Sequence, residues 1–261
     1  MLTVGCIGCG NMGGAMLRGL GKTGRYRLLG VEHHPEKLAA CGAEAADPGL
    51  IGREADIILV AVKPYAAAKA LEEALDGAPN RRRLVLSVVA GIGMKRLKAI
   101  AAGRAAVVRC MPNTPAAVGM GSFGVCLEDP ALDEEQKREV RELLGALGRV
   151  EELPESQFAP FTALMGCGPA YIFYVIEALA EAGVRMGFSR ARAVEMASWL
   201  CAGSAKLALQ PGAHPSILRE QVCSPAGSTI EGVAALDELA VKSAIEAAVF
   251  AAWEKEKSRE C

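Results

Sequence analysis

The sequence predicts an α/β fold in which an N-terminal domain built on a parallel sheet precedes an all-α domain. In the first part of the chain, short apolar runs alternate with helical patterns, and the strand expected at Asp56–Val62 is apolar after its first residue. Continuous apolar strands between helices are typical of a parallel sheet covered on both faces. After Pro154 the pattern changes, because Ala-rich helical segments follow and no convincing strand does. We therefore expect two domains, 1–154 and 155–261.

Within the first domain, the predicted strands and helices alternate along the chain. The other strands are expected at Thr3–Ile7, Leu28–Glu32, Leu84–Val89 and Val107–Arg109, with Val150–Leu153 closing the sheet. The helices are expected at Asn11–Leu20, Pro35–Cys41 and Asp133–Leu147. In the second domain, glycine and proline separate helices expected at Ala170–Met186, Ser189–Leu209, Pro215–Val222 and Leu239–Glu256.

The helices of the second domain are apolar over much of their girth, as in Ala197-Ser198-Trp199-Leu200-Cys201-Ala202. A helix of this kind packs against neighbours on several sides. A small helical domain supplies such packing most easily through a second subunit. We therefore expect a homodimer or a higher homo-oligomer.

The composition is that of a folded protein without a polyanionic partner. Hydrophobic residues make up 51% of the 261 residues and charged residues 23%, which allows a buried core and disfavours disorder. Lys and Arg (29) nearly balance Asp and Glu (30), so we expect no nucleic acid partner. No uninterrupted apolar stretch reaches the ~18–20 residues of a membrane span, so we expect no membrane partner. No signal peptide is expected at Met1–Ile7, which lacks a basic region.

The cysteines indicate a reducing compartment. They number 9, an odd count, and are scattered among apolar residues, which fits reduced thiols in a cytoplasmic protein better than a disulfide framework. Cys6 and Cys9 form a C-x-x-C pattern, but Cys6 falls in a predicted buried strand and no second pair offers metal ligands at a suitable spacing. We therefore expect no metal site.

A nucleotide-binding loop follows the first predicted strand. Gly8-Cys9-Gly10-Asn11-Met12-Gly13 is a G-x-G-x-x-G that opens a helix, and this context makes the pattern specific. Gly8 permits a tight turn, Gly10 lets the backbone approach a pyrophosphate, and the helix N-terminus supplies N–H donors. The first domain is therefore predicted to be a Rossmann-type dinucleotide-binding domain.

The end of the second strand bears on the choice of nucleotide. A carboxylate there binds a ribose 2′-hydroxyl and favours NAD, whereas a basic residue favours the 2′-phosphate of NADP. Glu32 favours NAD, while His33 and His34 could donate to a phosphate or lie in a solvated loop. The residues leave both NADP and NAD open as cofactors.

Four further segments resemble the pyrroline-5-carboxylate reductase family. With the nucleotide loop and His214-Pro215, they follow the family's order from end to end of the chain. They are Ala61-Val62-Lys63-Pro64, Met111-Pro112-Asn113-Thr114-Pro115, Gly166-Cys167-Gly168-Pro169-Ala170-Tyr171 and Ser224-Pro225-Ala226-Gly227-Ser228-Thr229-Ile230. The last segment is the most specific.

The resemblance implies NAD(P)H-dependent reduction of 1-pyrroline-5-carboxylate to L-proline and a dimerising helical domain. It implies that the cofactor is lined by the nucleotide loop, the end of the second strand, the Val-Lys-Pro turn and Ala90. The residues are Gly8, Gly10, Asn11, Met12, Glu32, His33, His34, Val62, Lys63, Pro64 and Ala90. It implies that Thr229 is catalytic and that the substrate is bound by Ser224, Ala226, Gly227, Ser228 and Thr229. Ser228 and Thr229 could instead merely cap a helix that begins near Ser228.

The chain departs from the family pattern in three places. Met165 and Cys167 stand where the family typically has serine, and Ala226 stands where it typically has the first of two glycines. The segment Glu32-His33-His34 lacks the basic residue that many members carry. These departures bear on the geometry of the substrate loop and on the choice of cofactor.

Reduction of a cyclic imine requires no buried Asp–His pair, because the imine nitrogen is basic enough to arrive protonated or to take a proton from water. His214 is expected to start a helix. Two alternatives stay open: a hydroxyacid dehydrogenase that recruits Lys206, which more simply extends from an Ala-rich helix, or an inactive NAD(P)-binding regulator.

Overall fold

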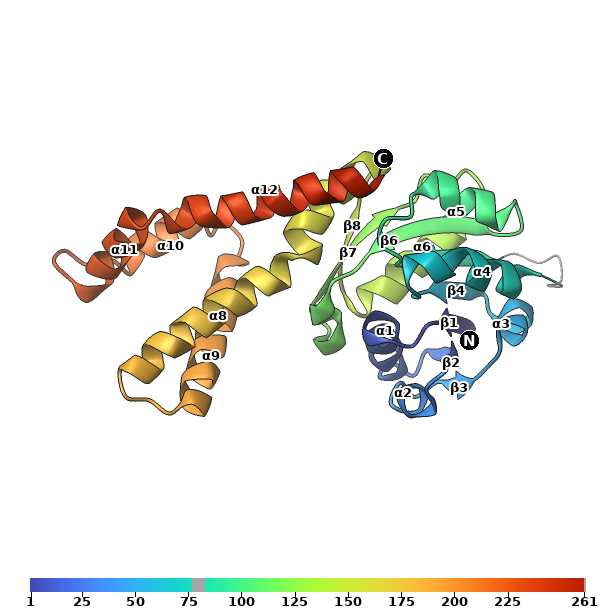
Figure 1. The fold of residues 1–261 in the computed structure, drawn as a ribbon, viewed down its shortest axis with the longest axis horizontal. Helices are drawn as coiled ribbons and strands as arrows, with labels where there is room; N and C mark the ends of the chain where they lie inside the picture. Colours follow the sequence, from blue (N-terminus) through green and yellow to red (C-terminus); the bar gives the residue numbers. More distant parts are fainter. Residues whose placement is uncertain (77–82, 261) are drawn as a thin grey trace. The chain divides into compact units, whose positions relative to one another are not determined.

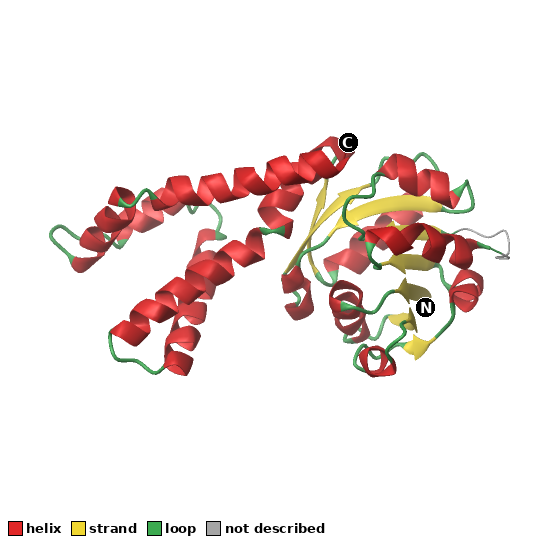
Figure 2. Ribbon diagram, viewed as in Figure 1, coloured by secondary structure: helices red, strands yellow, loops and turns green. Residues whose placement is uncertain are grey.

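The chain forms two compact units in a computed structural model that describes residues 1–76 and 83–260 (Figure 1). One unit comprises Met1–Cys167 and Ala252–Cys261, and the other comprises Gly168–Ala251. Among the described residues, all strands belong to the first unit, and the second is helical (Figure 2). The contacts divide at Cys167, and the domain boundary expected after Pro154 remains a prediction.

The first unit is built on an eight-stranded, mostly parallel sheet in the order β3-β2-β1-β4-β5-β6-β7-β8. Its strands are β1 (Leu2–Ile7), β2 (Tyr26–Val31), β3 (Glu44–Ala45), β4 (Ile57–Val60), β5 (Leu84–Ser87), β6 (Ala106–Met111), β7 (Gly121–Cys126) and β8 (Gly148–Glu152). The strand order reverses between β1 and β4, which is where ligands bind in open α/β sheets.

The sheet differs from the expected parallel arrangement at one edge, since β7 runs antiparallel to β6. The sequence analysis did not find β7, because two glycines interrupt its apolar pattern. Gly124 is needed there, since a Cβ atom would lie 2.8 Å from the ring of Phe161. The short β3 was also missed.

Helices cover both faces of the sheet and create two apolar cores. The cluster on one face includes Met16 of α1 and Leu143 of α6, and the cluster on the other includes Leu71 of α4 and Leu97 of α5. The helices are α1 (Asn11–Gly21), α2 (Pro35–Ala39), α3 (Pro48–Glu54), α4 (Pro64–Leu75), α5 (Met94–Ala101), α6 (Glu134–Gly145) and α7 (Phe158–Phe161), with short turns η1 (Thr114–Val118), η2 (Glu155–Gln157) and η3 (Thr162–Gly166). Of these helices, α3, α4, α5 and α7 were not predicted.

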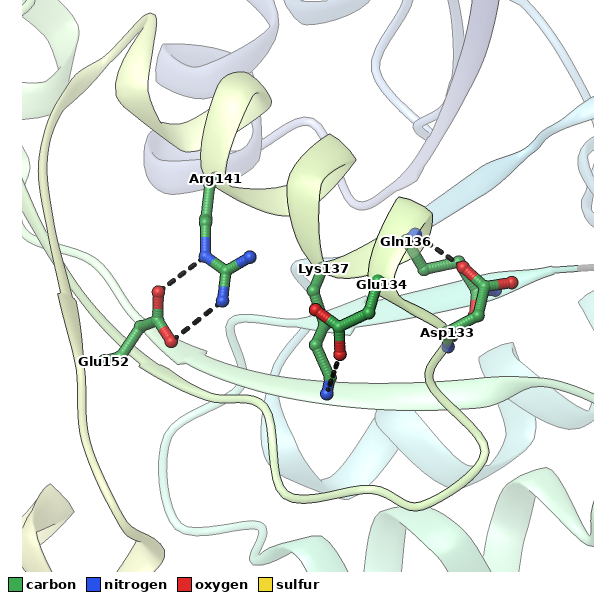
Figure 3. Close-up of polar contacts among 6 residues, drawn as sticks. All are labelled: Asp133, Glu134, Gln136, Lys137, Arg141 and Glu152. Carbon is green, nitrogen blue, oxygen red and sulfur yellow. Dashed lines mark hydrogen bonds and ion pairs between the residues drawn. The ribbon is translucent and has the colours of Figure 1, made fainter.

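A polar network holds α6 beside β8 (Figure 3). Asp133 caps the helix by accepting from Gln136 N, and the Gln136 side chain accepts from Asp133 N in return. Arg141 donates through two nitrogens to the carboxylate of Glu152, at 2.6 and 3.1 Å. The capping box fixes the helix start, and the Arg141–Glu152 pair joins the edge strand to the helix that precedes it.

The second unit contains α8 (Gly168–Arg185), α9 (Arg190–Ala208), α10 (Pro215–Gln221) and α11 (Ser228–Glu238), and most of α12 (Val241–Glu260). No strand occurs in its residues, as expected. Its side chains are largely exposed in the single chain, including Trp199 at 81% and Tyr174 at 74%. The helical stretch Glu155–Arg185 is long and apolar enough to cross a membrane by length and composition, with 11% of its apolar window buried.

A buried carboxylate ties the antiparallel edge to the rest of the sheet. Asp129 is 5% exposed, and it accepts from Val107 N at 2.8 Å and from Ala131 N at 3.2 Å. The ammonium of Lys98 lies 3.1 Å away. Burial acts to raise the pKa of Asp129, but these hydrogen bonds and Lys98 outweigh it, so the pKa lies below its ordinary value.

We predict that Asp129→Asn lowers the free energy of unfolding at neutral pH by about 1.5–3 kcal/mol, because a buried charge-assisted network is broken. A carboxyl group with a depressed folded-state pKa stabilises the fold above its unfolded pKa of about 3.9, and this stabilisation is lost as pH falls through the folded value. The gap between wild type and variant in urea midpoint should therefore shrink from pH 7 toward pH 3.5. A gap that stays constant over this range would contradict the prediction.

Candidate functional site

The nucleotide loop forms because two of its glycines, Gly8 and Gly13, let α1 approach β1 closely. Gly8 has a φ of +98°, in the left-handed region, and a Cβ there would lie 2.9 Å from the carbonyl oxygen of Ala61. A Cβ on Gly13 would lie 2.1 Å from the carbonyl oxygen of Gly8. Gly10, by contrast, faces open space. Its backbone is therefore accessible to a ligand, as the motif predicts.

The N-terminus of α1 is left without a side-chain cap. Gly10 is the N-cap residue and contributes no side-chain hydrogen bond. The first N–H groups of a helix have no intrahelical partner, and the helix dipole places partial positive charge there. This helix start can therefore bind the pyrophosphate of a dinucleotide.

A cavity of about 1100 Å³ opens at the carboxyl ends of β1, β2, β4 and β5. All the side chains that the sequence analysis assigned to the cofactor line it, from four separate loops: Gly8, Gly10, Asn11, Met12, Glu32, His33, His34, Val62, Lys63, Pro64 and Ala90. The size of the cavity, the open face of Gly10 and the uncapped helix fit a dinucleotide. The structure thus brings these residues together, while their contacts with a cofactor remain a prediction.

The turn after β2 lies directly beside the nucleotide loop. Gly8 N donates to the carbonyl oxygen of Val31 at 3.0 Å, so Glu32 follows immediately. One carboxylate oxygen of Glu32 accepts from His33 N at 2.9 Å and from His34 N at 3.3 Å. The imidazole of His34 lies 3.4 Å from the carboxylate of Glu36. Both histidines are exposed, in agreement with a solvated turn.

The sequence analysis missed several lining residues on α2 and α4. Lys37 lies on α2, and Tyr65, Lys69 and Glu73 lie on α4, whose first turn follows the predicted Val-Lys-Pro segment. The signal that could have found α4 is Pro64, since proline is favoured at the first position of a helix. Lys63 precedes it as N-cap residue without a side-chain cap bond.

The two cysteines of the nucleotide loop are core thiols. Cys6 is fully buried and Cys9 is 2% exposed. A hydrogen bond with Cys9 and burial raise the pKa of Cys6, while the same hydrogen bond lowers the pKa of Cys9. The eight cysteines in the described part of the chain form no disulfide, as the sequence predicts, and Cys261 lies outside it. Residues 1–76 and 83–260 contain no group of three or more ligands arranged for a metal ion.

One family-like segment is bonded, within the first unit, to the residue that precedes another. Asn113 is 6% exposed; its side-chain amide donates to the carbonyl oxygen of Met165 at 3.0 Å and accepts from Ser122 N at 2.9 Å. Met165 lies in η3, a π-helical turn that ends before Cys167. At position 165 the contact is made by the backbone, so methionine in place of serine leaves it intact.

The predicted substrate segment folds as a turn followed by a helix start in the second unit. Gly227 N donates to the carbonyl oxygen of Ser224 at 3.0 Å, with Pro225 and Ala226 between them. Ala226 has a φ of +57°, the left-handed conformation that a turn with proline at its second position favours at the third. A Cβ on Gly227 would lie 2.3 Å from the hydroxyl oxygen of Ser224. A side chain at 227 would therefore displace the Ser224 hydroxyl, and the alanine at 226 is strained by its left-handed conformation.

The start of α11 also lacks a side-chain cap. Gly227 is the N-cap residue, and neither Ser228 nor Thr229 makes a capping bond. The capping alternative is therefore wrong in this structure. The N–H of Gly227 is used within the turn, so the free donors are those of Ser228, Thr229 and Ile230, one residue later than expected. Ser224, Ala226, Ser228 and Thr229 are exposed, and Gly227 is partly exposed, in the single chain.

His214 and Lys206, the other two residues considered in the sequence analysis, lie at helix ends. His214 is the N-cap residue of α10, and its Nδ1 accepts from Ser216 N at 3.3 Å, so it starts a helix as expected. Lys206 is exposed in the last turn of α9.

A second hollow of about 310 Å³ lies near α6 and β8, where the cations of Lys137 and Arg141 are paired with Glu134 and Glu152.

Family models match two parts of the chain. The model for pyrroline-5-carboxylate reductase dimerisation matches residues 155–259, and the model for NADP oxidoreductase, coenzyme F420-dependent, matches residues 3–91. The second match includes the nucleotide loop and the turn after β2. The first includes the whole of the second unit.

Full-length relatives agree with these matches. The chain is 36% identical over 260 residues to the pyrroline-5-carboxylate reductase of Escherichia coli (strain K12), covering 97% of this chain and 96% of the relative. The structure of pyrroline carboxylate reductase from Plasmodium falciparum with NADP bound has a TM-score of 0.87 at 27% identity, covering 100% of this chain and 98% of the other. The pyrroline-5-carboxylate reductase structure from Coxiella burnetii has a TM-score of 0.88 at 29% identity, covering 99% and 98%. The chain belongs to the pyrroline-5-carboxylate reductase family.

Proposed function

We propose that this chain reduces 1-pyrroline-5-carboxylate to L-proline with NADPH or NADH, the last step of proline biosynthesis. The observation that carries the proposal is the uncapped N-terminus of α11, which follows the proline-fixed turn 224–227 in a chain that also holds a dinucleotide-sized cavity. Two anion-binding helix starts match the two anionic ligands of the reaction, a pyrophosphate and a carboxylate.

The residues at α11 would anchor and orient the substrate. The N–H groups of Ser228, Thr229 and Ile230 can donate to the substrate carboxylate, and the helix dipole favours negative charge there. The hydroxyl of Thr229 can exchange a hydrogen bond with the ring nitrogen, which makes it the candidate catalytic residue. Ser224 and Ala226 shape the turn that exposes these donors.

The residues of the first unit would hold the cofactor, which supplies a hydride when bound. The N-terminus of α1 would hold the pyrophosphate, and the Val62-Lys63-Pro64 turn and Ala90 line the same cavity. The imine carbon accepts the hydride and the ring nitrogen carries the proton, so charge is balanced without a buried acid–base pair. Position and orientation can account for about 7–11 kcal/mol of the barrier reduction.

The exposed apolar side chains of the second unit support a homodimer or a larger homo-oligomer. Trp199, Tyr174, Phe173 and Leu200 are between 56% and 81% exposed in the single chain. Exposed apolar surface of this extent marks an interaction site. We propose that a second copy covers it, rather than lipid, and that the protein acts in the cytoplasm on a small-molecule substrate without nucleic acid or membrane.

The purified protein is predicted to oxidise NADPH or NADH when 1-pyrroline-5-carboxylate is added, and its gene should restore growth of a proline auxotroph. The absorbance of the reduced nicotinamide measures the reaction. Oxidation of a 3-hydroxyacid with NAD⁺ but no imine reduction would show a hydroxyacid dehydrogenase instead. Nucleotide binding with neither reaction would show a regulator.

In the same assay, Thr229→Ala should lower kcat/KM at least about tenfold, because a hydrogen bond to a charged substrate is worth about 1.5–3 kcal/mol. Its affinity for nucleotide should stay within about twofold. Ser189→Ala is the matched control, since Ser189 does cap its helix, accepting from Arg192 N at 3.4 Å. The control should lose about 1 kcal/mol of stability and keep its efficiency. If Thr229→Ala behaves like the control, the substrate is held elsewhere.

Ala226→Gly should stabilise the protein, although it shortens a side chain. The left-handed conformation costs an alanine about 1–2 kcal/mol, and the extra backbone freedom of glycine offsets about 0.5–1 kcal/mol of the gain. We expect a net increase of about 0.5–1 kcal/mol in the free energy of unfolding by denaturant titration. Ala102→Gly is the control in the first unit, where φ is +49°, and should give a similar increase. A destabilised Ala226→Gly protein would exclude strain at this turn.

Light scattering at micromolar concentration should give at least twice the 27.2 kDa mass of one chain. Trp199→Glu should shift the mass toward the monomer, because a charge would be buried in an apolar interface. Val118→Glu serves as the control, since Val118 is 75% exposed in the first unit. A wild-type protein that is monomeric under these conditions would contradict the prediction.

A further inference from the structure

The turn after β2 contains a carboxylate bonded to its own backbone at the place where the two nicotinamide cofactors differ. We propose that Glu32 makes this enzyme select NADH over NADPH, because its carboxylate occupies the backbone N–H groups of His33 and His34 that a 2′-phosphate would use. The inference rests on the proposed function for its cofactor class, and goes beyond it in naming which cofactor is preferred and which residue decides.

The position of Glu32 follows from the sheet register. Ile7 of β1 pairs with Val31 of β2, and Gly8 N donates to the carbonyl oxygen of Val31 at 3.0 Å. Glu32 is therefore the first residue beyond the strand, beside the loop that approaches the pyrophosphate. In this fold, the residue at that point meets the 2′-position of the adenine ribose.

The two oxygens of the Glu32 carboxylate have different roles. Oε1 accepts from His33 N at 2.9 Å and from His34 N at 3.3 Å, which fixes the direction of the side chain. Within residues 1–76 and 83–260, no donor bonds to Oε2. A ribose 2′-hydroxyl can donate to that oxygen, as in NAD. A 2′-phosphate has no proton to donate when fully ionised, and it would have to displace the carboxylate to reach the two N–H groups.

Charged groups of both signs surround Glu32 in the cavity. Its own turn and the following helix α2 contribute His33, His34, Glu36 and Lys37, Lys63 precedes α4, and α4 contributes Lys69 and Glu73. His34 lies 3.4 Å from the carboxylate of Glu36, and Lys69 lies 3.7 Å from that of Glu73. A phosphate monoester adds about −1.5 to −2 charges near pH 7, directly beside the Glu32 carboxylate.

The test measures binding of both nucleotides to each protein without the imine. Dissociation constants for NADH and NADPH are obtained from nucleotide fluorescence, and those for 5′-ADP and 2′,5′-ADP isolate the ribose end. Wild type should bind NADH at least about tenfold more tightly than NADPH, since juxtaposed like charges are strongly unfavourable. Glu32→Gln keeps the size and an oxygen acceptor for the two N–H groups but removes the charge. It should tighten NADPH and 2′,5′-ADP at least about fivefold, as expected when a like charge is removed.

Glu36→Gln is the matched control, because Glu36 lies in α2, directly after the same turn, and does not line the cavity. It should leave the ratio of the two nucleotide affinities within about twofold. Because the ratio is measured within one preparation, partial misfolding of a variant does not affect it. Preference of wild type for NADPH, or an unchanged ratio in Glu32→Gln, would overturn the inference and point to the histidines as phosphate ligands. Failure of imine reduction with either cofactor would refute the proposed function without changing these affinities.

Discussion

The close approach of α1 to β1 at Gly13 is the constraint on which the nucleotide site depends. A Cβ there would lie 2.1 Å from the carbonyl oxygen of Gly8, so any other residue would push the helix away from the strand. The helix start would then no longer lie beside the end of β2, where Gly8 N donates to Val31 O. The cavity and the access to the backbone of Gly10 both depend on this contact.

Some helices of this protein have a side-chain cap at the N-terminus, and others have none. Asp47, Asp133 and Ser189 cap α3, α6 and α9 with side-chain oxygens, and of these three helix starts that of α3, at Pro48, lines the nucleotide cavity. The helices α1, α4 and α11 begin at the two predicted sites and have no side-chain cap. Backbone N–H groups of a helix start require a partner, and leaving them free of side chains keeps them available to an anion.

The helix α5 shows a third arrangement, in which a distant carboxylate serves as the cap. Glu155 accepts from Met94 N at 2.5 Å and from the guanidinium of Arg109 at 2.9 Å, and Arg109 lies 4.4 Å over the ring of Phe158. A charge-assisted bond of this kind is stronger than one between neutral groups. It joins β6, α5 and the segment that follows Pro154 into one body, so residues 155–167 pack with the first unit.

The sequence by itself determined the features that depend on neighbouring residues. The nucleotide loop, the apolar strands β1, β4 and β5 and the helices after Gly168 can be predicted from local pattern, because glycine spacing and apolar periodicity act within a few residues. Only the tertiary structure decided the antiparallel β7, since Gly124 is dictated by Phe161, which is far away in sequence. It likewise decided that the Glu32 carboxylate turns onto His33 N and His34 N, and that Thr229 leaves its helix uncapped. Side-chain direction depends on hydrogen bonds formed only once the backbone is folded, and no residue pattern fixes it.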